Sequence, residues 1–273
     1  MEGIPFFLLR KGKIFMGIQV GDILIPWYGM FIVTGIAAGA LAGYVLLRGT
    51  EMAYDDFVQA ACFVGLGAMA GAKLLYLAVS WDAIDFSRIT DPEYLGLLMG
   101  SGFVFYGGLL GGLAGLYLCG RILHIPVLAL ARETIPVIPL AHGFGRIGCA
   151  LVGCCYGIPY DGPGAVVYTD SPAAPLNTPL FPVQAVEAAG EFVIAAVLTV
   201  YIVRCRKQGK TPRSLGLYLG LYAVLRFFLE FVRYDDRERG IFLGISTSQW
   251  ISVAVLAAVA LHFKRYKKTD CPL

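Results

Sequence analysis

Residues 23–47 read ILIPWYGMFIVTGIAAGALAGYVLL, a run without a single charged side chain. A helix needs about 20 apolar residues to cross the hydrocarbon core of a bilayer, so this run is long enough to span a membrane. We interpret it as a helix of the mature protein and expect no cleavable signal peptide. The composition agrees, because 58% of the residues are hydrophobic, 15% are charged and the mean hydropathy is +0.70, whereas soluble domains carry about a quarter charged residues.

The remaining apolar runs complete a polytopic pattern of seven predicted transmembrane helices, at roughly 23–47, 56–80, 103–123, 127–152, 182–203, 214–233 and 245–263. The fourth run contains prolines and charged residues, so we expect it to be broken or kinked. The following segment, 157–181, is rich in proline and has neither Lys nor Arg, which predicts an ordered external arm. The predicted fold class is therefore an all-α integral membrane protein, with one polytopic domain over residues 1–273.

The distribution of basic residues predicts the orientation of the chain in the membrane. The loop 204–213 carries five basic residues and no acid, and the tail 264–268 is also basic. With seven spans these two segments share one side, which the positive-inside rule makes cytoplasmic. The acidic loop 81–100 then lies outside, as does the N-terminus. We expect residues 1–20 to lie flat on the outer surface, although the basic residues between 10 and 13 argue for the other side.

Several ionisable residues fall inside the predicted spans, where a charge costs at least about 2.5 kcal/mol. Residues three or four apart share one face of a helix, and two clusters do so: Tyr222, Arg226, Glu230 and Arg233, and Gln184, Glu187 and Glu191. These groups could form interhelical salt bridges that only fix the packing, and Arg233 could reach the interface by snorkelling. Alternatively, Arg226 and Arg146 could clamp a phosphate from two helices, which inside a membrane indicates a phospholipid headgroup.

Six short motifs give the chain a resemblance to the bacterial prolipoprotein diacylglyceryl transferases. They are IPWYGM at 25–30, GAKLLY at 71–76, YGGLLGG at 106–112, GRIG at 145–148, FPVQAVE at 181–187 and YAVLRFFLEF at 222–231. This family moves a diacylglyceryl group from phosphatidylglycerol to the thiol of a lipobox cysteine in a secreted preprotein, and glycerol phosphate leaves. The resemblance implies an enzyme of the bacterial plasma membrane, with its active site open toward the outer leaflet.

The resemblance also implies the partners and the site residues. The partners are an anionic phospholipid, a secreted preprolipoprotein and the bilayer, with no cofactor, metal or nucleic acid. Arg146 and Arg226 would bind the headgroup phosphate and stabilise charge on the leaving group. The expected catalytic residues are Arg146, Arg226, His142, Tyr106, Tyr222 and Glu230. The expected substrate-binding residues are Arg146, Arg226, Tyr28, Lys73, Gln184, Glu187, Cys149 and Cys154.

The chain departs from the family pattern at several polar positions. Tyr106 stands where the family usually has a histidine, Lys73 replaces an arginine, Phe181 replaces a histidine, and Cys149, Val152 and Cys154 replace two asparagines and a glutamate. His142 lies four residues before Arg146, so it could take the base role of the missing histidine or be a structural histidine. Tyr106 is a poor base at neutral pH and could instead donate a hydrogen bond to phosphate.

Three of the seven cysteines, at 149, 154 and 155, lie close together in the sequence. The chain has no CxxC pair and no His–Cys spacing typical of zinc, so we expect no metal from the spacing. Four interpretations stay open. The cysteines could pack as small residues, Cys149 could form a disulfide with Cys154 or Cys155, a thiolate could act as a nucleophile, or the group could bind a metal.

The leading hypothesis is a phosphatidylglycerol:prolipoprotein diacylglyceryl transferase. Two alternatives remain: a related phospholipid-dependent transferase with another acceptor, and a non-enzymatic phospholipid-binding or transport protein. The two halves of the chain show no inverted repeat, which argues against a secondary transporter. The seventh predicted span has no central lysine for a retinal Schiff base.

Overall fold

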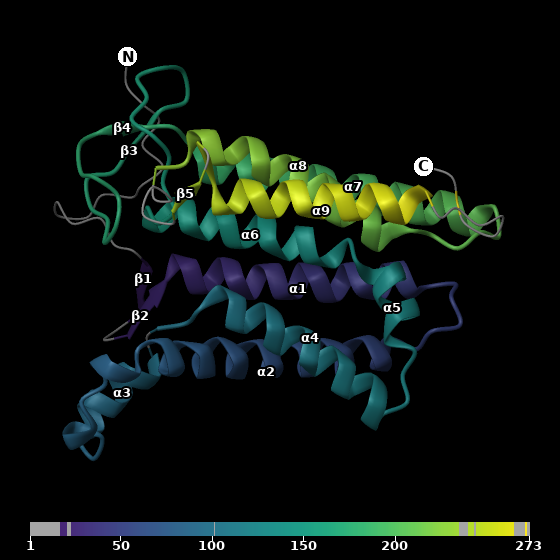
Figure 1. Cartoon of the computed structure of the whole chain (residues 1–273), viewed down its shortest axis with the longest axis horizontal. Helices are drawn as coiled ribbons and strands as arrows, with labels where there is room; N and C mark the ends of the chain where they lie inside the picture. Colours follow the sequence, from purple (N-terminus) through teal and green to yellow (C-terminus); the bar gives the residue numbers. More distant parts are fainter. Residues whose placement is uncertain are drawn as a thin grey trace. The chain divides into compact units, whose positions relative to one another are not determined.

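The computed structural model describes residues 17–20, 23–100, 102–234, 240–242, 244–264 and 271. The expectation that residues 1–20 lie on a membrane surface falls largely outside the described residues, as does most of the basic tail. The described part of the chain is mostly helical, and its strands are only two to four residues long (Figure 1). The coarse prediction of a helical membrane protein is therefore confirmed.

The helices are α1 (Trp27–Leu47), α2 (Tyr54–Val79), α3 (Pro92–Gly100), α4 (Phe105–Ile122), α5 (Val127–Thr134), α6 (Val137–Val152), α7 (Val183–Lys207), α8 (Ser214–Leu229) and α9 (Thr247–Lys264), with 3-10 helices η1 (Trp81–Ala83), η2 (Phe86–Arg88) and η3 (Glu230–Val232). The strands form antiparallel pairs, β1 (Gly17–Val20) with β2 (Ile23–Pro26), β3 (Val166–Val167) with β4 (Pro179–Leu180), and β5 (Ile241–Phe242) with β6 (Ile245–Ser246).

Four helical segments among the described residues are long and apolar enough to cross a bilayer: Trp27–Leu47, Tyr54–Val79, Val183–Lys207 and Ser214–Val232. The number rises to six if each of two bent pairs, α3 with α4 and α5 with α6, forms one span. The predicted break in the fourth run is confirmed, because α5 and α6 meet at 55°, where Pro136 has no backbone N–H to continue the first helix. Seven spans stay a prediction.

One helix lies where the sequence predicted only a loop. Pro92 opens α3, and proline at a first helical position sacrifices a backbone N–H that would have no helical partner. The Asp91 carboxylate accepts a hydrogen bond from the Glu93 backbone N–H at 3.0 Å, which caps the same turn. These local signals, followed by the apolar residues 95–99, override the acidic character of the loop.

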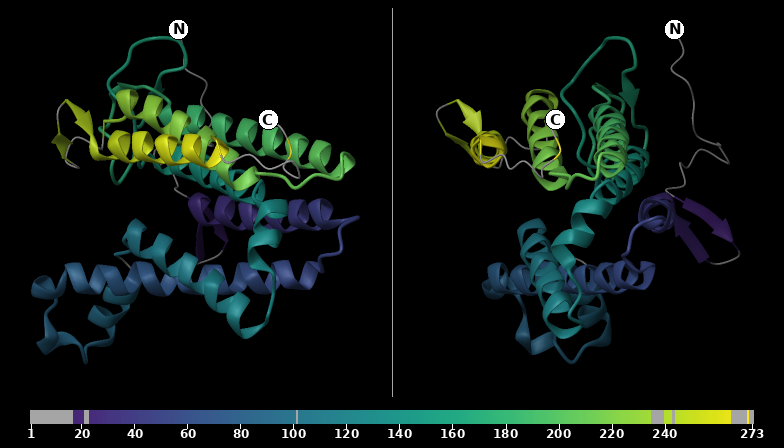
Figure 2. Two further views of the ribbon diagram at one scale, coloured as in Figure 1. Left: turned by 45° about the vertical axis from the view of Figure 1, so that its right-hand side comes forward. Right: turned by 90° about the vertical axis from the view of Figure 1, so that its right-hand side faces the viewer.

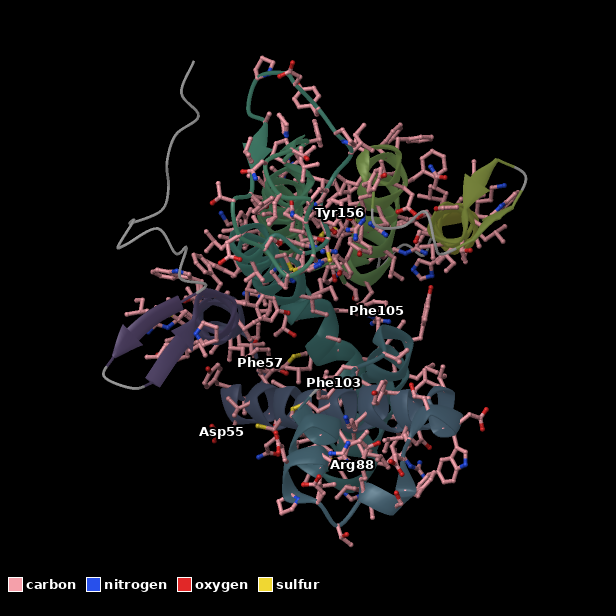
Figure 3. All side chains as sticks on the ribbon, turned by 90° about the vertical axis from the view of Figure 1, so that its left-hand side faces the viewer. Asp55, Phe57, Arg88, Phe103, Phe105 and Tyr156 are labelled. Atoms are coloured by element: carbon pink, nitrogen blue, oxygen red, sulfur yellow. A yellow bond between two sulfur atoms is a disulfide. The ribbon has the colours of Figure 1, made fainter. Side chains whose placement is uncertain are left out.

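The chain divides into two compact units, one of residues 1–46 and 132–273 and the other of residues 47–131. Figure 3 draws the side chains of both. Many large apolar side chains are exposed, among them Phe105 at the start of α4, which is labelled in Figure 3 and is 74% exposed. A surface rich in such side chains suits lipid rather than water. That residues 1–273 act as one polytopic domain remains a prediction.

In the unit of residues 47–131, α2 and α4 pack through glycine. A Cβ atom placed on Gly111 would lie 2.1 Å from the Gly67 carbonyl oxygen, and one on Gly107 would lie 2.3 Å from the Gly71 carbonyl oxygen. The two backbones therefore touch, with no room for a side chain between them. Small residues four apart on each helix produce this contact, the usual device for close packing in lipid.

In the larger unit, α6 packs on α7, α7 on α8 and α8 on α9 (Figures 1 and 2). α1 runs along α6, where a Cβ on Gly35 would meet the Ala141 carbonyl oxygen at 3.1 Å and one on Gly148 would meet the Tyr28 ring at 3.2 Å. Eleven residues of α7 are buried, including Ile194. A helix enclosed in this way must turn its polar side chains toward its neighbours rather than toward lipid.

The C-terminal end of α7 carries a disulfide and a pocket. Cys205 forms the disulfide with Cys271, a pairing that no sequence pattern predicted. The Cys271 carbonyl also accepts a hydrogen bond from the Tyr201 hydroxyl at 3.2 Å. Beside this link is a pocket of ≈ 620 Å³, lined mainly by apolar side chains such as Val200 and Leu217. Its lining holds neither the paired carboxylates nor the site arginines.

Candidate functional site

Glu187 on α7 is the centre of a buried ion-pair network. Its Oε1 lies 2.9 Å from Nη2 of Arg146 on α6, and its Oε2 lies 3.4 Å from Nη1 of Arg233. The Glu187 side chain is 1% exposed and that of Arg233 is 2% exposed. Breaking such a buried pair by removing one partner costs about 3–5 kcal/mol. One carboxylate therefore holds two guanidinium groups in fixed positions.

The structure corrects the prediction for Arg233. Snorkelling to the interface was one expectation, together with a helical face shared with Arg226. Helix α8 instead ends at Leu229, and after η3 the backbone of Arg233 is extended, with φ −87° and ψ 143°. This extended residue bridges to Gly157 and turns its side chain inward to Glu187. The prediction from helical periodicity failed because α8 ends four residues before Arg233.

A second pair lies one helical turn from the first. Nδ1 of His142 lies 2.7 Å from Oε1 of Glu191, whose side chain is fully buried. His142 precedes Arg146 by four residues and Glu191 follows Glu187 by four, so both pairs lie along the same α6–α7 interface. The His142 side chain is 31% exposed, and its ring centroid lies 6.0 Å from that of Tyr222 on α8. Glu191 was not among the expected site residues, although its spacing from Glu187 signalled it.

A third pair lies on α8 and its 3-10 extension. Nη2 of Arg226 lies 2.9 Å from Oε2 of Glu230 and 3.4 Å from the Ser248 hydroxyl. Tyr222 lies within electrostatic range of both Arg226 and Arg146. The structure thus brings together, around Tyr222, the two arginines that the sequence placed on different helices.

Tyr28 and Gln184 contact the segment that follows Arg146. Tyr28 on α1 lies within electrostatic range of Arg146 and of Cys149. Gln184 is buried, and its Nε2 donates a hydrogen bond to the Cys154 carbonyl at 2.9 Å. Gln184 therefore holds the backbone of this segment rather than facing an open space.

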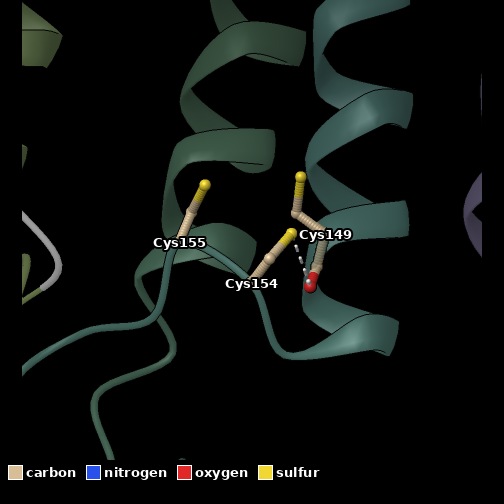
Figure 4. A group of neighbouring side chains, drawn as sticks. All are labelled: Cys149, Cys154 and Cys155. Carbon is tan, nitrogen blue, oxygen red and sulfur yellow. Dashed lines mark hydrogen bonds between the residues drawn. The ribbon is translucent and has the colours of Figure 1, made fainter. Parts of the chain in front are cut away.

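The three clustered cysteines come together at the end of α6 (Figure 4). Their sulfur atoms all lie within 4.8 Å of one another, and all three thiols are free and partly buried. The Cys154 thiol donates to the Cys149 carbonyl at 3.9 Å. Hydrogen bonds from Cys149 and Cys154, together with the positive charge of Arg146, hold the pKa of the Cys155 thiol well below its usual range.

The segment 157–181 secures this end of α6 and contains no helix. The Tyr168 hydroxyl donates to the Ala150 carbonyl at 2.8 Å, and the Ser171 hydroxyl donates to the Val152 carbonyl at 3.0 Å. Burial raises the pKa of Tyr168 to about 12, so its hydroxyl remains a donor at neutral pH. No sequence pattern signalled these two residues, because each contact joins positions 18 or 19 apart.

Lys73 and Tyr106 belong to the unit of residues 47–131. Lys73 is buried, its ammonium group donates to the Leu98 carbonyl, and it lies 4.8 Å from the Tyr76 ring centroid. Tyr106 is exposed in the first turn of α4 and touches the edge of the Phe105 ring. The other expected site residues all belong to the larger unit.

Two groups among the described residues have the ligand spacing for a metal ion: the three cysteines, and His142 with Glu187 and Glu191. In the second group, both carboxylates already lie against basic side chains, Glu187 against two arginines and Glu191 against His142.

Comparison with known proteins identifies the family of the chain. Residues 15–264 match the model of a family described as prolipoprotein diacylglyceryl transferase. The chain belongs to this family. It is 39% identical over 240 residues to the phosphatidylglycerol--prolipoprotein diacylglyceryl transferase of Clostridium tetani (strain Massachusetts / E88), which covers 85% of this chain and 92% of the relative.

Other relatives carry similar names. The chain is 35% identical over 246 residues to phosphatidylglycerol--prolipoprotein diacylglyceryl transferase 2 of Clostridium perfringens (strain 13 / Type A), covering 88% of this chain and 92% of the relative. A Dehalococcoides mccartyi (strain ATCC BAA-2100 / JCM 16839 / KCTC 5957 / BAV1) protein named as the same transferase is 29% identical over 256 residues, covering 92% and 93%. The resemblance drawn from the motifs is confirmed, and with it the class of enzyme and its integration in a bacterial membrane.

Proposed function

We propose that this chain transfers a diacylglyceryl group from phosphatidylglycerol to the thiol of a lipobox cysteine in a secreted preprolipoprotein, with release of glycerol phosphate. The observation that carries the proposal is the pair Arg146 and Arg226. They come from two helices, are each fixed by a buried carboxylate, and share Tyr222 within electrostatic range. A buried, oriented pair of guanidinium groups suits an anionic headgroup.

The ion pairs leave donors for a phosphate. Glu187 engages Arg146 through Nη2, and the Nε of Arg146 makes no hydrogen bond with any described residue. A guanidinium group has five N–H donors in a fixed plane, so one edge can hold the carboxylate while another meets phosphate oxygens. The carboxylates orient the arginines and offset their charge before the lipid binds.

The chemistry is a displacement at carbon. The acceptor sulfur attacks the glyceryl carbon that carries the phosphate, a C–S bond forms, and the C–O bond breaks with its electron pair on the phosphate oxygen. Negative charge grows on the leaving glycerol phosphate, where fixed positive charge lowers the barrier most. Tyr222 and Glu230 act in this step, the first as a hydrogen-bond donor to phosphate and the second by orienting Arg226.

His142 takes the acceptor proton in this proposal. Nδ1 of His142 lies 2.7 Å from a carboxylate oxygen of Glu191, and a proton held on Nδ1 leaves a lone pair on Nε2. A buried carboxylate behind an imidazole stabilises the charge that forms when Nε2 is protonated. The partial exposure of His142 gives the base access to a substrate.

The wider arrangement is also part of the proposal. The protein crosses the bacterial plasma membrane seven times, with its N-terminus outside, its C-terminus in the cytoplasm and its proline-rich arm on the outer face. Its site opens toward the outer leaflet. Tyr28, Lys73 and Tyr106 contact the lipid, Gln184 supports the site through Cys154, and Cys149 and Cys154 contact substrate.

The test uses the purified chain with phosphatidylglycerol and a synthetic lipobox peptide. Mass spectrometry is expected to find a diacylglyceryl thioether on the peptide, and none on a matched peptide with serine in place of cysteine. Phosphatidylethanolamine serves as the lipid control and is expected to give little product. No thioether from the wild-type chain, with both arginines intact, would contradict the proposed reaction.

A related transferase with another acceptor is the second candidate. It is favoured by the changed polar shell, in which Cys149, Cys154 and Phe181 replace residues that the family pattern makes polar. Rescue of a bacterial strain that lacks its own transferase separates the two. Failure to rescue, together with turnover of phosphatidylglycerol, would favour the second candidate. Bound lipid that is never cleaved would instead indicate a phospholipid-binding protein.

A further inference from the structure

The three cysteines have the geometry of a thiolate metal site. In a tetrahedral zinc complex with Zn–S bonds of about 2.3 Å, the sulfur atoms lie about 3.8 Å apart. The sulfur atoms of Cys149, Cys154 and Cys155 are all within 4.8 Å of one another, so they need to close by at most about 1 Å. Figure 4 shows all three directed to the same side of the chain.

The backbone is shaped to produce this convergence. Helix α6 ends at Gly153, which has φ 78°, and Cys155 has φ 55°. A left-handed conformation is costly for a residue other than glycine, about 1–2 kcal/mol. In an extended chain the side chains of Cys154 and Cys155 would point to opposite sides. The left-handed conformation of Cys155 breaks this alternation, so that the side chains of Cys154 and Cys155 point to the same side.

The same backbone is held from outside the cluster. Gln184 donates to the Cys154 carbonyl, Tyr168 to the Ala150 carbonyl and Ser171 to the Val152 carbonyl. Three side chains from distant parts of the sequence thus fix the backbone on both sides of Gly153. Metal sites depend on such outer contacts to position their ligands.

The local charge favours an anionic complex. Arg146 and Arg233, which both contact the Glu187 carboxylate, lie within electrostatic range of Cys155. Three thiolates with one Zn²⁺ carry a net charge of −1. Cations near the cysteines stabilise a complex of that charge.

Packing and disulfide formation explain less of this arrangement. A disulfide would use two of the three sulfur atoms and leave the third beside it. Packing needs neither a costly backbone conformation at Cys155 nor two nearby cations. Three convergent thiols beside two arginines match the protein part of a catalytic zinc site, which supplies three ligands and keeps a fourth position open.

We infer that Cys149, Cys154 and Cys155 bind Zn²⁺ and that the fourth position of the metal takes the thiol of the acceptor cysteine. The second half of this inference rests on the proposed transferase function. A thiol bound to zinc is deprotonated outright, which activates it near the phosphate clamp. Tyr106, which replaces the usual histidine, cannot supply that activation as a base.

The step balances without an oxidant or a reductant. The acceptor thiol binds zinc and gives its proton to water. The zinc-bound sulfur then forms the C–S bond as the C–O bond to phosphate breaks, and the electron pair leaves with glycerol phosphate. The leaving phosphate takes up a proton from water, and the thioether, a weaker zinc ligand, departs.

The first experiment measures metal in the full-length chain, purified in detergent under reducing conditions. Elemental analysis is expected to find one Zn²⁺ per chain in the wild type. Cys149→Ser and Cys154→Ser should each weaken Zn²⁺ binding at least about 100-fold. Cys62→Ser removes an exposed thiol on α2 and is the matched control, expected to bind normally. Unchanged binding in the Cys149→Ser/Cys154→Ser double variant would overturn the inference.

The second experiment needs no variant. Co²⁺ replaces Zn²⁺ in the wild-type chain, and the thiolate-to-cobalt absorption is recorded while lipobox peptide is added. A change with the cysteine peptide, and none with its serine counterpart, is expected if the acceptor thiol becomes the fourth ligand. An absorption that the cysteine peptide leaves unaltered would refute the acceptor half of the inference. A Cys149–Cys154 or Cys149–Cys155 disulfide in the chain as isolated would refute the whole.

A transfer assay separates this inference from the proposed function. Removal of the metal should slow thioether formation at least about 100-fold, and Zn²⁺ should restore it. Full transfer by the metal-free chain would overturn the inference and leave the proposed function standing. A chain that binds Zn²⁺ and the peptide thiol but forms no thioether would refute the proposed function and leave the metal site standing.

Discussion

The most extensive helix pair in each of the two units is held together in a different way. In residues 47–131, α2 and α4 meet backbone to backbone over Gly67 and Gly111. In the larger unit, α6 and α7 meet over carboxylate pairs to Arg146 and His142. Lipid tails are as apolar as leucine, so hydrophobicity does not drive helices together in a bilayer.

The two kinds of contact differ in what they contribute. Glycine contacts maximise dispersion and leave nothing reactive behind. Buried ion pairs roughly cancel their own desolvation cost, so they are poor devices for stability alone. Their use in α6 and α7 supports the proposed role of these charges in the reaction.

The largest expected effect is loss of the phosphate clamp. Arg146→Ala and Arg226→Ala should each lower thioether formation at least about 1000-fold, because a fixed charge at the leaving group is removed. Product is measured by mass spectrometry with phosphatidylglycerol and a lipobox peptide. Arg88→Ala, which removes an exposed arginine paired with Asp91, is the control and should keep the wild-type rate. Activity of either alanine variant within tenfold of wild type would contradict the clamp.

The next effect should fall on stability in the other unit. Gly111→Leu places a side chain where a Cβ already lies 2.1 Å from a carbonyl oxygen, so α2 and α4 must separate. We expect a destabilisation of about 3 kcal/mol, seen as a lower melting temperature in detergent. Gly65→Ala on α2 is the matched control, since nothing lies within 4 Å of its Cβ. Equal melting temperatures for the two variants would show that the close contact is not needed.

A smaller effect is expected at the second polar pair. His142→Ala should lower the transfer rate about 100-fold if His142 is the base. Glu191→Gln, which keeps the shape but not the charge behind the imidazole, should lower kcat with little change in KM. Full activity of His142→Ala, with an unchanged melting temperature, would rule out the base role and leave a structural histidine.

The smallest effect concerns an exposed pair in the acidic loop. The hydrogen bonds from Arg88 and from the Glu93 backbone N–H hold the pKa of Asp91 below its ordinary value of 3.8. A lowered folded-state pKa stabilises the fold above pH 3.8 and ceases to do so as the pH falls through the folded value. Asp91→Asn should therefore lower the melting temperature only slightly at neutral pH, and not at all in strong acid. A large loss at neutral pH would show that exposed pairs matter here.

The sequence by itself determined the membrane class, the family and the break before α6. Length and hydropathy decide these properties, because a bilayer demands long apolar helices whatever their packing. The chain also showed that Arg146 and His142 share a face, since four residues make one helical turn. It showed that Arg226 and Glu230 do so for the same reason.

Only the tertiary structure decided which charges meet. Glu187 contacts both Arg146 and Arg233 because α8 ends at Leu229 and the backbone then turns Arg233 inward. The helical periodicity of the sequence did not predict that helix end. The tertiary structure also brings together Cys149, Cys154 and Cys155. This convergence depends on the left-handed backbone of Cys155 and on hydrogen bonds from Gln184 and from the segment 157–181. Contacts between residues distant in the chain depend on how helices end and pack, and local sequence patterns do not encode those choices.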